Sequence, residues 1–261
     1  MKSIAITSLA FVNASLKANL EQFNNRTDTN PSLRAFKGNV ATAFDPIKGY
    51  GCWCYLDDSW RDPSKAAINR PSISAHGIPV DPIDEACRNL INSYKCVEMD
   101  AEAENIDNCD AQAVEYTPFN VFEAGVPFNQ LSTVLEADCV SRNQDKNICA
   151  KNACIVEGAF TINFISFIFG AQEITDHPNF NPDYVHISNG GTFDPEVECP
   201  GIPNPVGSEK ECCGSFVDLS RHPYRLFSGF TTRSCCSGEV INNEINSCCN
   251  GIILDVGESC P

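Results

Sequence analysis

The histidines are the side chains of this sequence best suited to proton transfer near neutral pH, because an imidazole titrates there and can act as a general base in hydrolysis. The chain has four of them: His76, His177, His186 and His222. All four lie in stretches expected to be loops, and none has a recognised spacing to a Ser, Cys or Asp nucleophile. The pattern predicts surface histidines and no catalytic triad.

The sixteen cysteines are typical, in number and density, of disulfide bonds formed in an oxidising compartment. Thiol catalysis and zinc binding are therefore disfavoured. Eight cysteines lie between Cys52 and Cys154 and eight between Cys199 and Cys260. We expect each set to close its bonds internally, which predicts two separately stapled domains joined by a turn-rich linker at residues 173–198.

The N-terminal residues favour secretion. A basic start, the apolar run Ile4–Val12 and the small residues around Ala14 predict a signal peptide at residues 1–14. The alternative is a buried first helix of the mature fold. Residues 15–30 are polar and form a loose arm or a propeptide, in which Asn25 begins a glycosylation sequon.

The formal charge is −16, from 34 acidic and 18 basic residues. Such a surface repels nucleic acids and anionic bilayers, which excludes those partners. Cations or basic partners are favoured, and the alternative is that the acidity only keeps an extracellular protein soluble. The apolar run Ala159–Gly170 is shorter than the ~20 residues that cross a bilayer, so we expect no transmembrane segment.

Three amphipathic helices are expected from apolar residues spaced three to four apart. The first contains Leu33 and Phe44, the second runs from about Asp81 to Cys96, and the third runs from about Asn147 to Phe169. The second and third are the long helices that would form the core.

Two motifs on these elements resemble those of secreted phospholipase A2. Tyr50–Cys54 is similar to the Tyr-Gly-Cys-x-Cys calcium loop of that family, and Gly77–Cys87 is similar to the segment that leads into its catalytic helix. The resemblance implies a mainly α, phospholipase A2-like domain of disulfide-linked helices over residues 31–172.

The resemblance also implies that the catalytic residues are missing. The family's catalytic histidine falls on Leu90 and its calcium-binding aspartate on Ile91; in a register with one inserted residue, the pair falls on Ile91 and Asn92. Neither register supplies the imidazole that the family uses to activate water. Three supporting positions are retained at Asp84, Tyr94 and Glu157.

The cysteine pattern fits the same register. Two cysteines five apart precede Glu157 by the family's spacing, and two of the family's bridges have lost both ends, at Ala86 with Asn163 and at Ser93 with Val156. The resemblance further implies that Cys54 bonds to Cys87.

Calcium is the one cofactor that the resemblance implies. The family's carbonyl ligands would fall on Trp53, Tyr55 and Asp57, in a loop that lacks the family's glycines after Cys54. Asp57 and Asp58 could instead bind calcium through their side chains. The simpler expectation is a solvated acidic loop.

Residues 199–261 contain three cysteine doublets, at Cys212-Cys213, Cys235-Cys236 and Cys248-Cys249. We expect each doublet to bond to two separate partners, because neighbouring cysteines bridge each other only with strain. Short strands are expected at Glu239–Asn246, with a hairpin turn at Asn242-Asn243, and at Ile252–Val256. The doublets resemble di-cysteine modules of extracellular matrix proteins such as the galaxins.

These patterns favour a secreted, non-catalytic phospholipase A2-like protein with a small disulfide-rich β or irregular C-terminal domain. It would serve as an extracellular structural or binding component, through a protein partner or self-assembly. The alternative is a calcium-dependent phospholipase with a displaced active site. A lipid or fatty-acid slot between the two long helices is a further expectation, which a slot filled by Phe160, Phe164 or Trp53 would argue against.

Overall fold

The computed structural model describes residues 47, 49–55, 77–120, 126, 130–168, 175, 177–199, 210–225 and 232–260. The expected signal peptide, the polar arm with Asn25, the first helix at Leu33–Phe44, and Asp57 with Asp58 lie outside these residues. So does His76.

Helix α4 spans Pro82–Ala103 and begins with strong N-terminal signals. The Asp81 side chain accepts the backbone N–H of Asp84, and Pro82 occupies the first helical position, where no N–H is needed. The helix continues about two turns beyond the predicted end at Cys96. Val97 and Ala101 extend its buried stripe, so packing against the core continues the helix beyond the residues with a clear periodic pattern.

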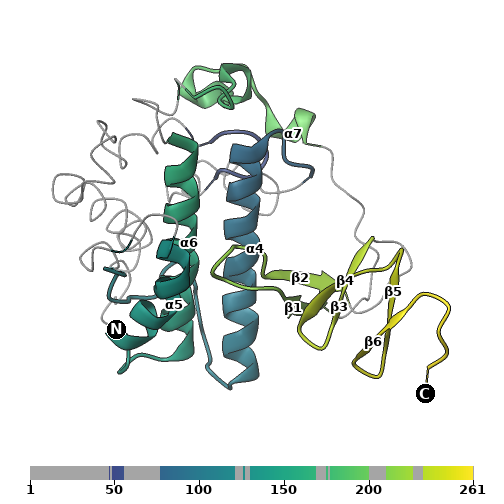
Figure 1. Cartoon of the computed structure of the whole chain (residues 1–261). Coiled ribbons are helices and arrows are strands. Elements are labelled where there is room, and N and C mark those ends of the chain that lie inside the picture. Colours follow the sequence, from purple (N-terminus) through teal and green to yellow (C-terminus); the bar gives the residue numbers. More distant parts are fainter. Residues whose placement is uncertain are drawn as a thin grey trace, which may run out of the picture.

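Helices α5 (Leu131–Arg142) and α6 (Ile148–Ile168) are the other long helices among the described residues. Helix α6 packs along α4, and α5 packs on α6 (Figure 1). The stretch Ile148–Phe167 is long and apolar enough to cross a membrane by length and composition, which the sequence analysis had not expected. Because 72% of the most apolar window is buried inside the protein, α6 has the burial of a core helix.

The expected linker is partly packed against the helical part. It contains the 3₁₀ helices η8 (Pro182–Tyr184) and η9 (Ile187–Asn189) and the short helix α7 (Pro195–Glu198). Tyr50 forms a β-bridge with Val185, and its ring stacks on Phe180 at 5.3 Å. These contacts place residues 180–193 against the 49–55 loop.

The described residues of the C-terminal part, 210–225 and 232–260, form three two-stranded antiparallel hairpins. Hairpin 1 pairs β1 (Lys210–Cys213) with β2 (His222–Arg225), hairpin 2 pairs β3 (Arg233–Cys236) with β4 (Glu239–Asn242), and hairpin 3 pairs β5 (Asn246–Cys249) with β6 (Ile252–Asp255). They follow one another outward from α4 (Figure 1).

The prediction of a hairpin turn at Asn242-Asn243 is wrong. A strand does begin at Ile252, as predicted. The two-residue turns are Ser237-Gly238 and Asn250-Gly251, and all four residues have positive φ. Such a turn matches the twist of the strands and favours glycine at its second position. The sequence signal for both turns was therefore the Cys-Cys-x-Gly motif itself.

All sixteen cysteines are paired, which confirms the predicted disulfide-rich character. The expectation that each set closes internally is wrong, because Cys52–Cys199 and Cys96–Cys212 join the helical part to the C-terminal residues. The physical reason is that hairpin 1 packs directly on α4, where the Arg221 guanidinium also makes two hydrogen bonds to the Asp100 carboxylate. Three bonds lie within the helical part: Cys54–Cys87, Cys109–Cys149 and Cys139–Cys154.

The doublets do bond to two partners each, as predicted. The second cysteine of one doublet bonds to the first cysteine of the next, in Cys213–Cys235 and Cys236–Cys248, and Cys249 bonds to Cys260. Together with Cys96–Cys212, these bonds form a covalent ladder that runs from α4 through all three hairpins.

Candidate functional site

Asp84 holds the 49–55 loop against the start of α4. Its buried carboxylate accepts the backbone N–H groups of Cys52 at 2.9 Å, Trp53 at 2.7 Å and Val80 at 3.0 Å. Burial raises the pKa of Asp84 to about 6, while the three N–H donors oppose that shift. A Cβ on Gly51 would lie 2.5 Å from the Asp84 carboxyl carbon, so the contact also requires glycine there.

Glu157 lies at the centre of a buried hydrogen-bonded group between α4, α6 and the segment before α5. The Tyr94 hydroxyl donates to Oε1 at 2.9 Å, and the Tyr116 hydroxyl donates to Oε2. Glu157 is 1% exposed, and burial raises the pKa of its carboxyl to about 8 against the lowering effect of both tyrosines. Sequence reasoning identified Tyr94 and Glu157 but missed Tyr116, which lies in a loop with no periodic signal.

Leu90 and Ile91 occupy the positions where the resemblance places the catalytic pair. Leu90 has no exposed surface and Ile91 is 9% exposed, so both are core residues on the inner face of α4. Because Phe160, Phe164 and Trp53 are also buried, the packing argues against an open fatty-acid slot at this position.

The described residues do not fit a calcium site of the kind that the resemblance implies. The Trp53 carbonyl already accepts the Tyr55 N–H at 2.8 Å, and Ile91 stands where a carboxylate ligand would be required. Calcium prefers six to eight oxygen ligands, with carboxylates among them. The Asp84 carboxylate cannot supply them, since it is engaged by three N–H groups.

Cys54 and Cys87 are joined by a disulfide, the pair that the resemblance implies. The bond fixes the 49–55 loop to α4 one turn after Asp84. Asp84 and this disulfide therefore hold the same loop from two neighbouring turns of one helix.

The three described histidines lie outside the long helices, His177 and His186 in the expected linker and His222 in β2. His177 lies in an exposed turn, where its Nδ1 accepts the Asn179 N–H. His186 is buried, and burial lowers its pKa. The His222 ring lies 3.0 Å from the Leu219 carbonyl oxygen, and burial lowers its pKa as well.

Within the part of the chain that the structure describes, one group of possible metal ligands lies in hairpins 1 and 2: Glu211, Cys213 and Cys235. The two sulfur atoms are bonded to each other, so neither is available as a thiolate ligand.

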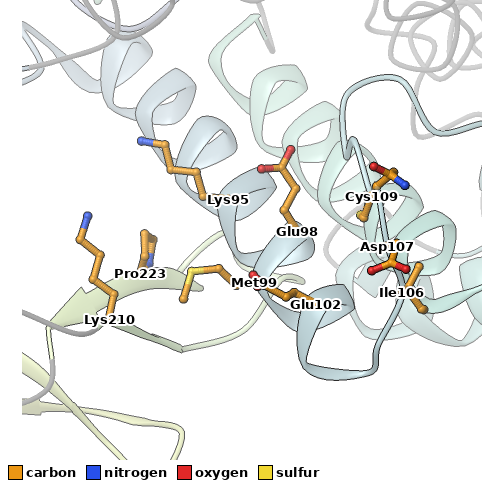
Figure 2. A pocket seen from close by; sticks show the side chains of 10 residues that line it. Lys95, Glu98, Met99, Glu102, Ile106, Asp107, Cys109, Lys210 and Pro223 are labelled. Atoms are coloured by element: carbon orange, nitrogen blue, oxygen red, sulfur yellow. The ribbon is translucent and has the colours of Figure 1, made fainter.

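A cleft of about 520 Å³ lies between α4, the loop after it and hairpin 1 (Figure 2). Lys95 and Lys210 lie on one side and Asp107 on the other, with Glu98 between them. Burial, and then the neighbouring charge of Lys210, lowers the pKa of Lys95. The residues of α4 that line the cleft lie on the outer face of the helix, whereas Leu90 lies on its buried face. The cleft is therefore separate from the site that the resemblance implies.

Comparisons with family models, with curated proteins and with solved structures gave no match for this chain.

The Glu157 carboxyl makes a testable contribution to the pH dependence of stability. Its pKa is raised from 4.5 to about 8, so the folded protein holds a proton that the unfolded chain releases. Stability from this group is therefore complete below pH 4.5 and is lost as the pH rises through 8. We expect the free energy of unfolding to fall by about 1 kcal/mol between pH 7 and pH 8.5 because of this group.

The matched variant is Glu157→Gln, which keeps the shape of the neutral carboxyl but does not titrate. Urea unfolding at several pH values, with disulfides intact, should show a flatter profile for the variant in this window. Asp84, His186 and His222 contribute mainly below pH 7, since the folded pKa of Asp84 is about 6 and those of the histidines are lowered from 6.5. Equal slopes for the two proteins would show that Glu157 is ionised in the fold.

Proposed function

We propose that this chain is a secreted, non-catalytic protein with a phospholipase A2-like helical part, acting outside the cell as a structural or binding component. The observation that carries the proposal is the burial of Leu90 and Ile91 at the expected catalytic positions, beside a supporting framework that is intact. That framework is Asp84 on the 49–55 loop and Tyr94 on Glu157.

The missing side chains remove the chemistry that the resemblance would otherwise imply. Phospholipid hydrolysis of this kind needs a base that takes a proton from water and a cation that stabilises the developing oxyanion. Leu90 is apolar and inaccessible, so it can neither accept a proton nor meet a substrate. The unsuitable calcium ligands around Trp53 support the same conclusion.

The eight disulfides support the extracellular part of the proposal, because such a density is typical of proteins in oxidising compartments. The hairpin ladder supports a structural function. It fixes three small hairpins that could not bury enough apolar surface to be stable alone. Its resemblance to di-cysteine matrix modules agrees with a durable extracellular component.

The second candidate is a phospholipase with a displaced active site, which the retained Asp84, Tyr94 and Glu157 favour. The raised pKa of Glu157 is a property that acid-base residues also have. Glu157 is enclosed, however, and both of its oxygens accept tyrosine hydroxyls. We therefore rank the structural function first.

Hydrolysis of phosphatidylcholine vesicles by the purified, disulfide-bonded protein separates the two candidates. We expect no release of fatty acid above the protein-free rate, with calcium or with a chelator. If release did occur, Glu157→Gln and His186→Ala variants would identify the displaced base by the loss of that rate. Calcium-dependent release at any rate above background would contradict the first candidate.

A further inference from the structure

Two lysines from distant parts of the chain lie on the same side of the cleft between α4 and hairpin 1. Lys95 is on the outer face of α4, and Lys210 is the first residue of β1 (Figure 2). Among the described residues, no ion pair joins either ammonium group to a carboxylate. The cleft therefore concentrates uncompensated positive charge in a chain whose formal charge is −16.

The surroundings of Lys95 leave its ammonium group in need of a negative partner. The charge of Lys210 lowers its pKa more than the charge of Glu98 raises it. The Glu98 carboxylate instead accepts the Ala111 N–H, at 3.4 Å. The Lys95 Nζ lies 5.9 Å from the centre of the Trp53 ring, a cation–π contact that holds the side chain without neutralising it. An anion between the two lysines would relieve their repulsion.

The Cys96–Cys212 disulfide fixes the positions of both lysines. Lys95 directly precedes Cys96, and Lys210 shares a face of β1 with Cys212, because side chains two apart on a strand point the same way. Beside this bond, the Met99 sulfur lies 3.5 Å from the Cys212 sulfur and lines the cleft. The two ammonium groups are therefore held together before any ligand arrives, which lowers the entropic cost of binding.

The rest of the cleft limits what else the ligand can carry. Its volume of about 520 Å³ is within the range of ~300–1,000 Å³ that is usual for small-molecule sites, so it has room for more than one anionic group. Glu102 and Asp107 also line it and offer acceptors for an ammonium or hydroxyl group (Figure 2). These carboxylates repel polyanions, so the lining favours a small ligand with a single anionic group.

We propose that this cleft binds a small phosphate monoester, with its phosphate between Lys95 and Lys210 and an ammonium or hydroxyl group toward Asp107. A phosphate monoester carries a charge of about −1.5 to −2 near neutral pH, which matches two ammonium groups, whereas one ammonium group would match a carboxylate. The inference goes beyond the proposed function and does not depend on it. The cleft lies apart from Leu90, so ligand binding can be present or absent whatever the hydrolysis assay gives.

Isothermal titration calorimetry of the full disulfide-bonded protein, with inorganic phosphate and with O-phosphoethanolamine, tests the proposal. We expect one saturable site for each probe. Lys95→Met or Lys210→Met should raise both dissociation constants about 10-fold, since each variant removes one charged donor. If Lys95→Met disturbs the packing on Trp53, Lys210→Met still tests the site. Lys146→Met is the matched control, because Lys146 is exposed before α6 and does not line the cleft.

Asp107→Asn tests the two ends of the ligand separately. We expect this variant to bind O-phosphoethanolamine more weakly, because its ammonium group loses a charged acceptor. It should bind inorganic phosphate at least as tightly as the unchanged protein does, because a carboxylate that repels the anion is removed. Unchanged affinity for O-phosphoethanolamine would overturn the placement of the ammonium group toward Asp107.

Saturable phosphate binding that the Lys95 and Lys210 variants weaken and Lys146→Met leaves unchanged supports the proposal. The absence of saturable binding would overturn it, as would an equal loss in Lys146→Met, which would indicate attraction by overall charge alone. Acetate binding as tight as that of phosphate would overturn the assignment of a doubly charged group. Binding to vesicles that contain phosphatidic acid, without binding of either soluble probe, would assign the two lysines to a lipid surface and would also overturn it.

Discussion

Replacing Asp84 with alanine should lower the free energy of unfolding by at least about 3 kcal/mol, since three buried N–H groups would lose their acceptor. Each unsatisfied buried donor costs about 1 to 3 kcal/mol. The loss should appear first in the 49–55 loop, because Cys52 and Trp53 both donate to this carboxylate. Chemical denaturation with disulfides intact measures the total, and hydrogen exchange of the Cys52 and Trp53 amides locates it.

Glu85→Ala is the matched control for this prediction. Glu85 is the next residue in the same helical turn, but its side chain is 53% exposed and forms an ion pair with Arg88 on the surface of the helix. Exposed pairs of this type contribute about 0.5 kcal/mol or less. Equal effects of the two variants would mean that Asp84 acts only as a charge near the helix N-terminus and does not organise the loop.

Removing the Cys96–Cys212 bond by a double alanine substitution should destabilise the protein by about 3 kcal/mol. The two residues are 116 apart in sequence, but a shorter covalent route of about 24 residues remains through two other disulfides. Those are Cys54–Cys87 and Cys52–Cys199. The bond closes this smaller ring, so the loop-entropy estimate is lower than the sequence separation alone would give.

The part of the protein that is destabilised distinguishes the Cys96–Cys212 bond from the other disulfides of the ladder. Hairpin 1 should remain docked in part through Arg221 and Asp100, but amides in β1 and β2 should exchange faster. Removing Cys249–Cys260, which joins β5 of hairpin 3 to the chain after β6 over a separation of 11 residues, should leave α4 and hairpin 1 unchanged. An equal effect of both removals on α4 would contradict the docking of hairpin 1 on that helix.

The sequence predicted the parts of the fold that depend on local periodicity. Apolar spacing located α4 and α6, and the Asp81-Pro82 start of α4 carries its own capping signal. Its extra turns were missed because Val97 and Ala101 are too few to form a clear pattern without knowledge of what they pack against. Where such a helix ends depends on which of its residues are buried, and burial depends on contacts with distant parts of the chain.

Contacts between distant residues could not be predicted from the same patterns. Disulfide connectivity depends on which surfaces meet, so an even count on each side of a gap did not exclude Cys96–Cys212. Tyr116 joins Glu157 across 41 residues from a loop, and no spacing rule identifies such a partner. The hairpin turns were misplaced because Asn242-Asn243 is a good turn sequence that competes with the better Ser237-Gly238.

The initial rate of calcium-dependent fatty-acid release from phosphatidylcholine vesicles tests the central claim most directly, because it measures the reaction that the resemblance to phospholipase A2 implies. With Leu90 and Ile91 in the core, we predict a rate equal to that of vesicles without protein, unchanged by adding or chelating calcium. A rate that rises with protein concentration and disappears on chelation would contradict the assignment of a non-catalytic protein.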